Sequence, residues 1–293
     1  MHIENFLQFI QIEKRYSMNT LLSYKKDLEQ FQVFLHLQYD DVPLEQVVFH
    51  QVRSWVVYLM QEGVNPRSIN RKLSTLRTFY KFLIRTGVIQ QNPMQGLQGP
   101  KTSKRNPSFV PESAMEQLLD KLVFPEGFEG VRDRAILETF YFTGIRRAEL
   151  MGIQEQDINF GMHTLKVLGK RNKERLIPLS PVLEELLKTY IREKSEAGFS
   201  SENLFVDNKG RPIQARFVYS LVNKYLSAVT TIERKSPHIL RHTFATHMLN
   251  NGAELNAIKE IMGHASLAAT QVYTHNSLEK LKQVHKKAHP RSK

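Results

Sequence analysis

The sequence predicts a mainly α-helical protein with a small antiparallel β-sheet, divided into two domains. Its 293 residues are about twice the length of an average domain. Apolar residues recur every three or four positions over most of the chain, as in amphipathic helices, and alternate with polar residues in one short stretch. A segment rich in proline, glycine and basic residues separates the two regions.

The first ninety residues are expected to form helices joined by short polar segments. In residues 19–37 and again in 67–85, apolar side chains fall on one helical face, so each face belongs to a core. The opposite face of the second helix is polar and basic. It is either an ordinary solvated surface or one that contacts nucleic-acid phosphates. Its members are Arg67, Arg71, Ser74, Thr78 and Lys81.

Residues 91–108 are predicted to link domains at 1–90 and 109–293. The segment combines helix breakers, such as Asn92-Pro93 and Gly99-Pro100, with a basic run that shows no apolar periodicity. The run either provides solubilising charge or lies extended along a phosphate backbone. Its basic residues are Lys101, Lys104 and Arg105.

The second domain is predicted to be helical around one β-hairpin. Residues 163–168 alternate between polar and apolar, a Gly-Lys-Arg-Asn turn follows, and residues 175–179 form the second strand. Residues 204–207 are expected to add one more short strand. The remaining segments are predicted to be helical: 111–122, 131–142, 182–194, 215–228 and 237–289.

The composition narrows the classes of function. With 41 Lys and Arg against 29 Asp and Glu, the formal charge of +12 favours a polyanionic partner such as nucleic acid or an anionic membrane surface. The absence of cysteine excludes disulfides, thiolate catalysis and cysteine-bound metals. The start of the chain lacks a signal-peptide profile, and the longest apolar run, 55–60, is too short to span a membrane. We therefore expect a cytoplasmic protein.

An arginine is expected at a helix start near the middle of the chain. Gly144 interrupts the preceding helix, so Arg146 begins the next one, and Glu149 follows three residues later on the same face. Taken alone, this pattern also fits a surface ion pair of little energetic importance.

A second cationic segment surrounds a predicted helix N-terminus. Ser236 is the expected N-cap and Pro237 the first helical residue, so His238 and Arg241 face one way beside free backbone N–H groups. That arrangement favours phosphate binding. A metal site at His238 and His242 is disfavoured because Arg241 lies between them and the metalloprotease pattern is absent.

Two later segments contain the remaining candidates. His264 follows a glycine at a helix end, where a histidine usually caps the helix or packs in the core. Tyr273 lies in the segment 271–275, and a lone tyrosine usually packs against its neighbours. Neither pattern on its own assigns a function.

Together these residues resemble the tyrosine recombinase (phage integrase) family. Six positions occur in the family's order with compatible spacing, and the N-terminal half is similar too, so the resemblance covers essentially the whole chain. The segments 141–150, 169–175 and 238–247 resemble the bacterial, Xer-like site-specific recombinases. The six positions are Arg146, Lys170, His238, Arg241, His264 and Tyr273.

The resemblance implies an enzyme that cuts and rejoins DNA through a 3′-phosphotyrosyl intermediate, without metal, cofactor or ATP. Tyr273 would be the nucleophile that attacks phosphorus. Arg146 and Arg241 would bind the scissile phosphate, since guanidinium groups donate paired hydrogen bonds to it. Lys170 would protonate the 5′-oxygen leaving group.

The histidines and Glu149 would support this chemistry. His238 would act as an acid or base near the tyrosine, and His264 would donate a hydrogen bond to the phosphate. Glu149 would orient Arg146 or a histidine, or would remain a surface ion pair.

Two positions depart from the family: Arg171 replaces a glycine of the hairpin turn, and Met262 replaces a common leucine.

The resemblance also implies partners. The SAM-like core-binding domain and the catalytic domain would close around double-stranded DNA that carries a specific recombination site, in a homo- or hetero-tetramer. A second recombinase and a DNA translocase are further expected partners, and the protein would associate with the nucleoid. The last helix carries an apolar stripe that would dock into a neighbouring protomer. It comprises Leu278, Leu281, Val284 and Ala288.

Resolution of chromosome or plasmid dimers, at chromosome partition and cell division, is the favoured role. A mobile-element integrase or transposase often carries an extra N-terminal domain, for which this chain has no room. The same residues would also fit a type IB topoisomerase, or a DNA-binding protein whose catalytic site is vestigial.

Overall fold

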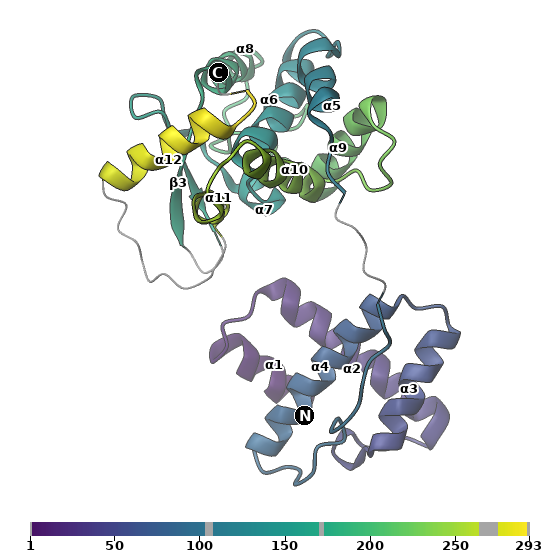
Figure 1. Cartoon of the computed structure of the whole chain (residues 1–293). Helices are drawn as coiled ribbons and strands as arrows, with labels where there is room; N and C mark the ends of the chain where they lie inside the picture. Colours follow the sequence, from purple (N-terminus) through teal and green to yellow (C-terminus); the bar gives the residue numbers. More distant parts are fainter. Residues whose placement is uncertain (1, 103–107, 170–172, 264–274, 292–293) are drawn as a thin grey trace. The chain divides into compact units, whose positions relative to one another are not determined.

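The protein consists of two compact units, Met1–Arg105 and Asn106–Lys293 (Figure 1). The computed structural model describes residues 2–102, 108–169, 173–263 and 275–291. No helix in these ranges is long and apolar enough to cross a membrane.

The first unit is helical, as the sequence predicts. The apolar positions of 19–37 and 67–85 lie on buried faces, and residues such as Phe31, Leu73 and Leu76 have no exposed surface. Trp55 packs against Phe31 at the centre of this core. The helices are α1 (His2–Ile12), α2 (Met18–Tyr39), a 3₁₀ turn (Leu44–Gln46), α3 (Phe49–Gln61) and α4 (Pro66–Arg85).

The beginning of the expected linker packs against the first unit. Met94 and Leu97 are buried in its core. The side chain of Asn70 donates to the Pro100 carbonyl at 2.9 Å, and Arg77 Nη2 donates to the Leu97 carbonyl at 2.9 Å. Residues 92–100 therefore form a strap along α4 rather than a free connection.

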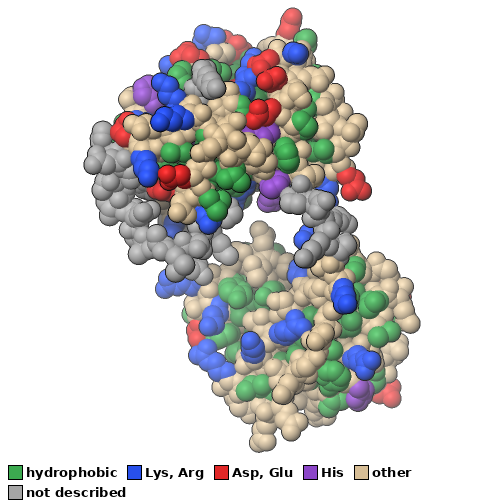
Figure 2. All heavy atoms as spheres, viewed as in Figure 1, with side chains coloured by type: hydrophobic (Ala, Val, Ile, Leu, Met, Phe, Trp, Pro, Cys, Tyr) green, Lys and Arg blue, Asp and Glu red, His purple; other side chains and the backbone are tan. Residues whose placement is uncertain are grey.

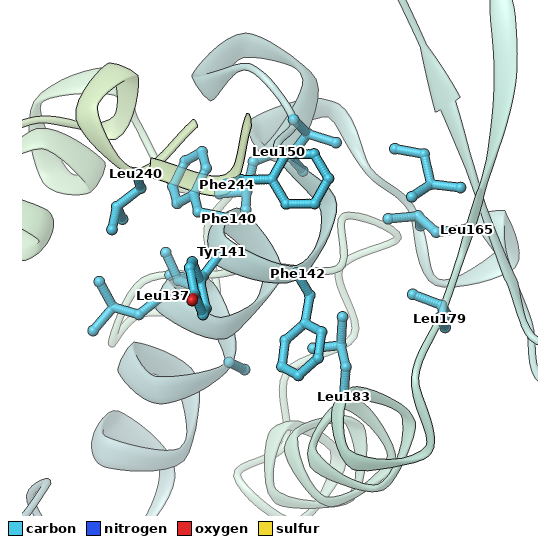
Figure 3. Packing of buried hydrophobic residues seen from close by; sticks show 14 of the residues in the cluster. Leu137, Phe140, Tyr141, Phe142, Leu150, Leu165, Leu179, Leu183, Leu240 and Phe244 are labelled. Carbon is cyan, nitrogen blue, oxygen red and sulfur yellow. The ribbon is translucent and has the colours of Figure 1, made fainter. Parts of the chain in front are cut away.

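The second unit is built around α6 (Phe128–Thr143), which is buried along most of its length. Its aromatic residues pack against Phe244 of α10 (Pro237–Asn250) and Leu183 of α8 (Pro181–Glu196) (Figure 3). Most other predicted helices are present with similar bounds. They are α5 (Glu112–Glu116) with a π-helical turn (Gln117–Lys121), α8 (Pro181–Glu196) and α9 (Ala215–Val229). The helix expected to begin at Arg146 is α7 (Arg147–Gly152), and a 3₁₀ turn that was not predicted follows it (Glu155–Asp157).

The predicted hairpin is present and gains a short third strand. β2 (Thr164–Leu168) pairs with β3 (Glu174–Pro178) in antiparallel register, with Val167 opposite Arg175, and β1 (Ile158–Asn159) extends the sheet. The expected strand at 204–207 is wrong: Val206 makes only an isolated bridge to Pro212, and its backbone N–H donates to the Tyr190 hydroxyl at 3.1 Å instead of to a neighbouring strand.

The expected helix over 237–289 is also wrong as a single element. Gly252 and Gly263 adopt positive φ angles, which end a helix because they reverse the backbone twist. The segment therefore contains α10 (Pro237–Asn250), α11 (Leu255–Met262) and α12 (His275–Ala288).

The apolar stripe of α12 packs on its own chain. Leu281 and Ala288 are buried in the core of the second unit, and Leu278 is buried as well. α12 lies against β3, α10 and α11 (Figure 1). The expectation that this stripe is left for a neighbouring protomer therefore does not describe this structure, in which the stripe already has a partner.

Candidate active site

The site begins at the junction of α6 and α7, where the chain turns sharply. Gly144 has a φ of +59°, and a Cβ atom there would lie 2.3 Å from the ring of Phe244. Only glycine combines this φ with such close packing. The turn places Arg146 as the N-cap residue of α7, as the sequence predicts.

Arg146 is held by Glu149 and by the end of α11. Its Nη1 donates to Glu149 Oε1 at 2.8 Å, and its backbone N–H donates to Glu149 Oε2 at 2.8 Å. Its Nη2 donates to the Gly263 carbonyl at 3.0 Å. The side chain remains 35% exposed, so a ligand can still reach it.

Arg241 lies in the first two turns of α10 and is buried. Its Nη2 donates to the Met262 carbonyl at 2.8 Å, and its Nη1 donates to the Gly144 carbonyl. Burial, reinforced by the charge of Arg146, lowers the pKa of Arg241 to about 10. Because this pKa is still well above 7, the guanidinium stays protonated at neutral pH.

Two arginines that are far apart in the sequence thus converge on the C-terminal end of α11. The Met262 carbonyl accepts from Arg241 and, at 3.4 Å, from Arg146. A helix C-terminus carries unpaired carbonyls and partial negative charge, which attracts guanidinium groups. The structure therefore brings together the two cations that the sequence proposed as a phosphate clamp.

Arg175 is a third cation of the site, and it was not expected from the sequence. It lies on β3 and is buried, with Nη1 and Nη2 donating to the two oxygens of Glu149 at 3.0 and 2.8 Å. Its Nε donates to the Ile261 carbonyl at 2.7 Å. One signal could have revealed it: strand alternation points Arg175 to the core, where a charge needs a partner.

Glu149 is not a surface ion pair. Its side chain is 5% exposed and accepts from both Arg146 and Arg175. Burial on its own would raise the pKa of Glu149, but the hydrogen bonds and charges of the two arginines lower it. The carboxylate is therefore ionised and joins the two guanidinium groups.

The remaining candidates of the second unit are only partly described. Ser236 is the N-cap residue of α10 and Pro237 its first residue, as predicted, and His238 is exposed in the first turn. Lys170, Arg171, His264 and Tyr273 lie outside the described residues. Within the described ranges, no group of three His, Asp or Glu side chains could hold a metal ion.

The DNA-contact candidates of the first unit lie along α4. Arg67, Ser74 and Lys81 are exposed, and Thr78 is half-buried with its hydroxyl donating to the Ser74 carbonyl at 2.9 Å. Lys and Arg side chains are scattered over the face of this unit seen in Figure 2. Lys101 is exposed, whereas Lys104 and Arg105 lie outside the described residues.

Arg71 differs from the other candidates on α4. Its guanidinium donates twice to Asp27, including Nη2 to Oδ1 at 2.8 Å. Asp27 is buried and also accepts from Lys72 and from the Thr75 hydroxyl. Arg71, which is still 49% exposed, therefore has a structural role whether or not it contacts DNA.

Comparison with known proteins identifies the family. The phage integrase family matches residues 108–280, and the phage integrase N-terminal SAM-like domain matches residues 3–87. The chain is 39% identical over 289 residues to a tyrosine recombinase XerC of Staphylococcus saprophyticus, covering 98% of this chain and 97% of the relative. It is 36% identical over 295 residues to the XerC of Bacillus subtilis, covering 99% and 96%.

Solved structures share the fold. The XerH site-specific recombinase bound to a palindromic difH substrate aligns with a TM-score of 0.73 and 20% identity, over 97% of this chain and 83% of that one. The Tn1549 transposon integrase in complex with circular intermediate DNA aligns with a TM-score of 0.72 and 18% identity, over 95% and 98%. With two family models and full-length relatives in agreement, the chain belongs to the phage integrase family, the tyrosine recombinases, and is an enzyme that cuts and rejoins DNA at specific sites.

Proposed function

We propose that this chain is a Xer-type recombinase that resolves dimers of circular chromosomes or plasmids when replicated DNA is partitioned. The convergence of Arg146 and Arg241 on the end of α11 carries the proposal. Arg146 and Arg175 both bind one carboxylate, Glu149, and Arg241 donates to neighbouring backbone carbonyls, so these three cations and one anion leave positive charge available for a phosphate. The XerC names of its full-length relatives support the role in dimer resolution.

The cations address the main difficulty of the reaction. A phosphodiester repels an incoming nucleophile, and its transition state places more charge on the non-bridging oxygens. Arg146 and Arg241 would stabilise that charge, since donors fixed in advance need no reorganisation during the reaction. Loss of one such donor set typically slows catalysis by about 100- to 1,000-fold.

Four further residues of the family pattern would carry the proton and covalent steps. Tyr273 attacks phosphorus, forms the 3′-phosphotyrosyl bond and expels the 5′-oxygen, which takes a proton from Lys170. His238 takes the tyrosine proton, and His264 donates to a phosphate oxygen. Attack by a 5′-hydroxyl of the partner strand then releases Tyr273, so the phosphodiester energy is conserved and no ATP is needed.

A suicide substrate tests the chemistry. A DNA site is first selected by the protein from a pool of random duplexes, and a nick is placed beside the cleavage position so that rejoining is prevented. We expect a covalent protein–DNA adduct with the unmodified chain and none with Tyr273→Phe. DNA binding without any adduct would instead support a DNA-binding protein with a vestigial site.

The first unit would bind DNA through α4. Arg67→Ala and Lys81→Ala should each weaken binding uniformly across sequences and reduce the salt slope by about one. These variants are more informative than Arg71→Ala, which also breaks the contact with Asp27. Unchanged salt slopes in both variants would place the DNA surface elsewhere.

We further propose that four copies assemble on two DNA sites, with a second recombinase and a DNA translocase as partners. In this assembly α12 would leave its own core and dock into a neighbouring protomer. Mass measurements on DNA should show four recombinase chains per pair of sites. A truncation after His275 that kept full cooperative recombination would contradict the exchange of α12.

A further inference from the structure

Arg175 connects three segments that carry proposed catalytic residues. It extends from β3, which begins shortly after Lys170 in the sequence. It binds both oxygens of Glu149, which holds Arg146 on α7. It also donates to the Ile261 carbonyl in the last turn of α11, shortly before His264 in the sequence.

The packing around this guanidinium is tight on the side of α11. A Cβ atom at Gly263, whose φ is +63°, would lie 3.1 Å from Arg175 Nη1. A Cβ atom at Gly169 would lie 3.5 Å from the same nitrogen and 3.6 Å from Glu149 Oε1. Gly263, which ends α11, therefore leaves room for the Arg175 side chain, whereas a Cβ atom at Gly169 would make only ordinary contacts with the pair.

The buried carboxylate of Glu149 must be neutralised by a neighbouring cation. Glu149 is 5% exposed and ionised, so it needs a cation whether or not DNA is bound. Arg175 satisfies both carboxylate oxygens in a bidentate arrangement. Without Arg175, Arg146 would be the one arginine left on Glu149 among the residues that the structure describes, and its charge would neutralise the carboxylate instead of a phosphate.

We propose that Arg175 is a positioning residue of the recombination reaction, which neutralises Glu149 so that Arg146 stays available to the scissile phosphate. The inference rests on the proposed role of Arg146 and extends it to a residue that does not itself touch DNA. Arg175 also fixes the register between β3 and the end of α11 through its Ile261 contact.

The test compares the single-turnover rate of adduct formation on the suicide duplex at saturating protein. Arg175→Met removes the charge and the hydrogen bonds but keeps an unbranched side chain. We expect adduct formation about 100-fold slower, since small displacements of a reacting group have effects of this size. The DNA dissociation constant should change less than about three-fold, since Arg175 is buried.

A second substitution separates charge balance from simple damage to the fold. In the Arg175→Met background, Glu149→Gln removes the carboxylate that would otherwise occupy Arg146. The double variant should therefore react about 10-fold faster than Arg175→Met alone, a non-additivity of the size found for contacting residues. Arg175→Lys, which keeps the charge, should also react faster than Arg175→Met.

Arg132→Met is the matched control. Arg132 is 3% exposed and donates to Asp133 at 2.8 and 3.0 Å, so its loss also breaks a buried ion pair of the second unit away from Glu149. We expect a lower melting temperature with an unchanged adduct rate in the folded fraction.

The outcomes separate this inference from the proposed function. If the unmodified chain forms no adduct, the proposed function fails. If it does, and Arg175→Met reacts at the normal rate or the Glu149→Gln double variant reacts no faster than Arg175→Met, the inference is overturned.

Discussion

Mild acid should release α12 from the second unit. His285 of α12 and His289, the residue that follows α12, bury their imidazoles against the end of α6. Their Nε2 atoms contact the carbonyls of Phe142 at 2.7 Å and Tyr141 at 3.0 Å, and their rings stack with centroids 5.0 Å apart. Because a carbonyl only accepts, each Nε2 carries the hydrogen.

The pKa directions set the sign of the effect. Burial lowers the pKa of His285, and burial together with the charge of His285 lowers the pKa of His289 well below 6.5. Above pH 6.5 both imidazoles are neutral whether α12 is docked or free, so docking is independent of pH. Below it, the free helix binds protons that the docked helix excludes, so docking weakens as the pH falls towards the lowered values.

The magnitude follows from the number of groups. For each histidine that docking keeps neutral, docking of α12 weakens by about 1.4 kcal/mol for every pH unit below the pKa of the undocked residue. With both residues 2% exposed or less, the docking free energy should fall by about 2.7 kcal/mol per pH unit. Hydrogen exchange of α12 amides in the full chain, corrected for intrinsic rates, measures this slope.

Glutamine provides the control. In the double variant His285→Gln, His289→Gln, side-chain amides can donate to the same carbonyls but cannot titrate in this range. The slope contributed by α12 should therefore disappear while docking persists at neutral pH. Exchange protection that does not change on acidification, or an equal slope in the double variant, would refute the reasoning.

Two further predictions concern stability. Asp27→Ala removes the buried carboxylate that faces Lys72, so the free energy of unfolding of the first unit should fall by about 3–5 kcal/mol. Urea unfolding followed by the fluorescence of Trp55 measures this loss, and an unchanged midpoint would contradict the role of Asp27. Gly144→Ala places a Cβ atom 2.3 Å from Phe244 at a positive φ, so calorimetry should show a lower melting temperature and a cost of at least about 1–3 kcal/mol; an unchanged melting temperature would mean that the ring moves aside freely.

Much of the fold could be predicted from local patterns. The spacing of Leu73 and Leu76 identified the buried face of α4, and the alternation of 163–168 identified the hairpin, because these signals depend on neighbouring residues. The strand expected at 204–207 was wrong because strand formation depends on residues that are distant in the sequence. A short apolar run cannot show whether another strand lies beside it.

The sequence singled out three residues that the structure brings together, but not the network of hydrogen bonds that joins them. Arg146, Glu149 and Arg241 could be singled out because each lies near a helix start. Arg175 could not, since its role depends on which carboxylate and which carbonyl the tertiary fold places beside it. The cis docking of α12 was missed for a similar reason, because an apolar stripe does not specify which surface covers it.

The strap formed by residues 92–100 determines where two recombinases of this family should be joined to make a chimeric protein. The family models end at residue 87 and resume at residue 108, which leaves the intervening stretch unassigned. Here that stretch includes Met94 and Leu97, whose side chains complete the first hydrophobic core. In a chimeric recombinase joined before Met94, the helices of the first unit would come from one parent and the two core residues Met94 and Leu97 from the other. A junction after Pro100 would keep the helices and these two residues from the same parent.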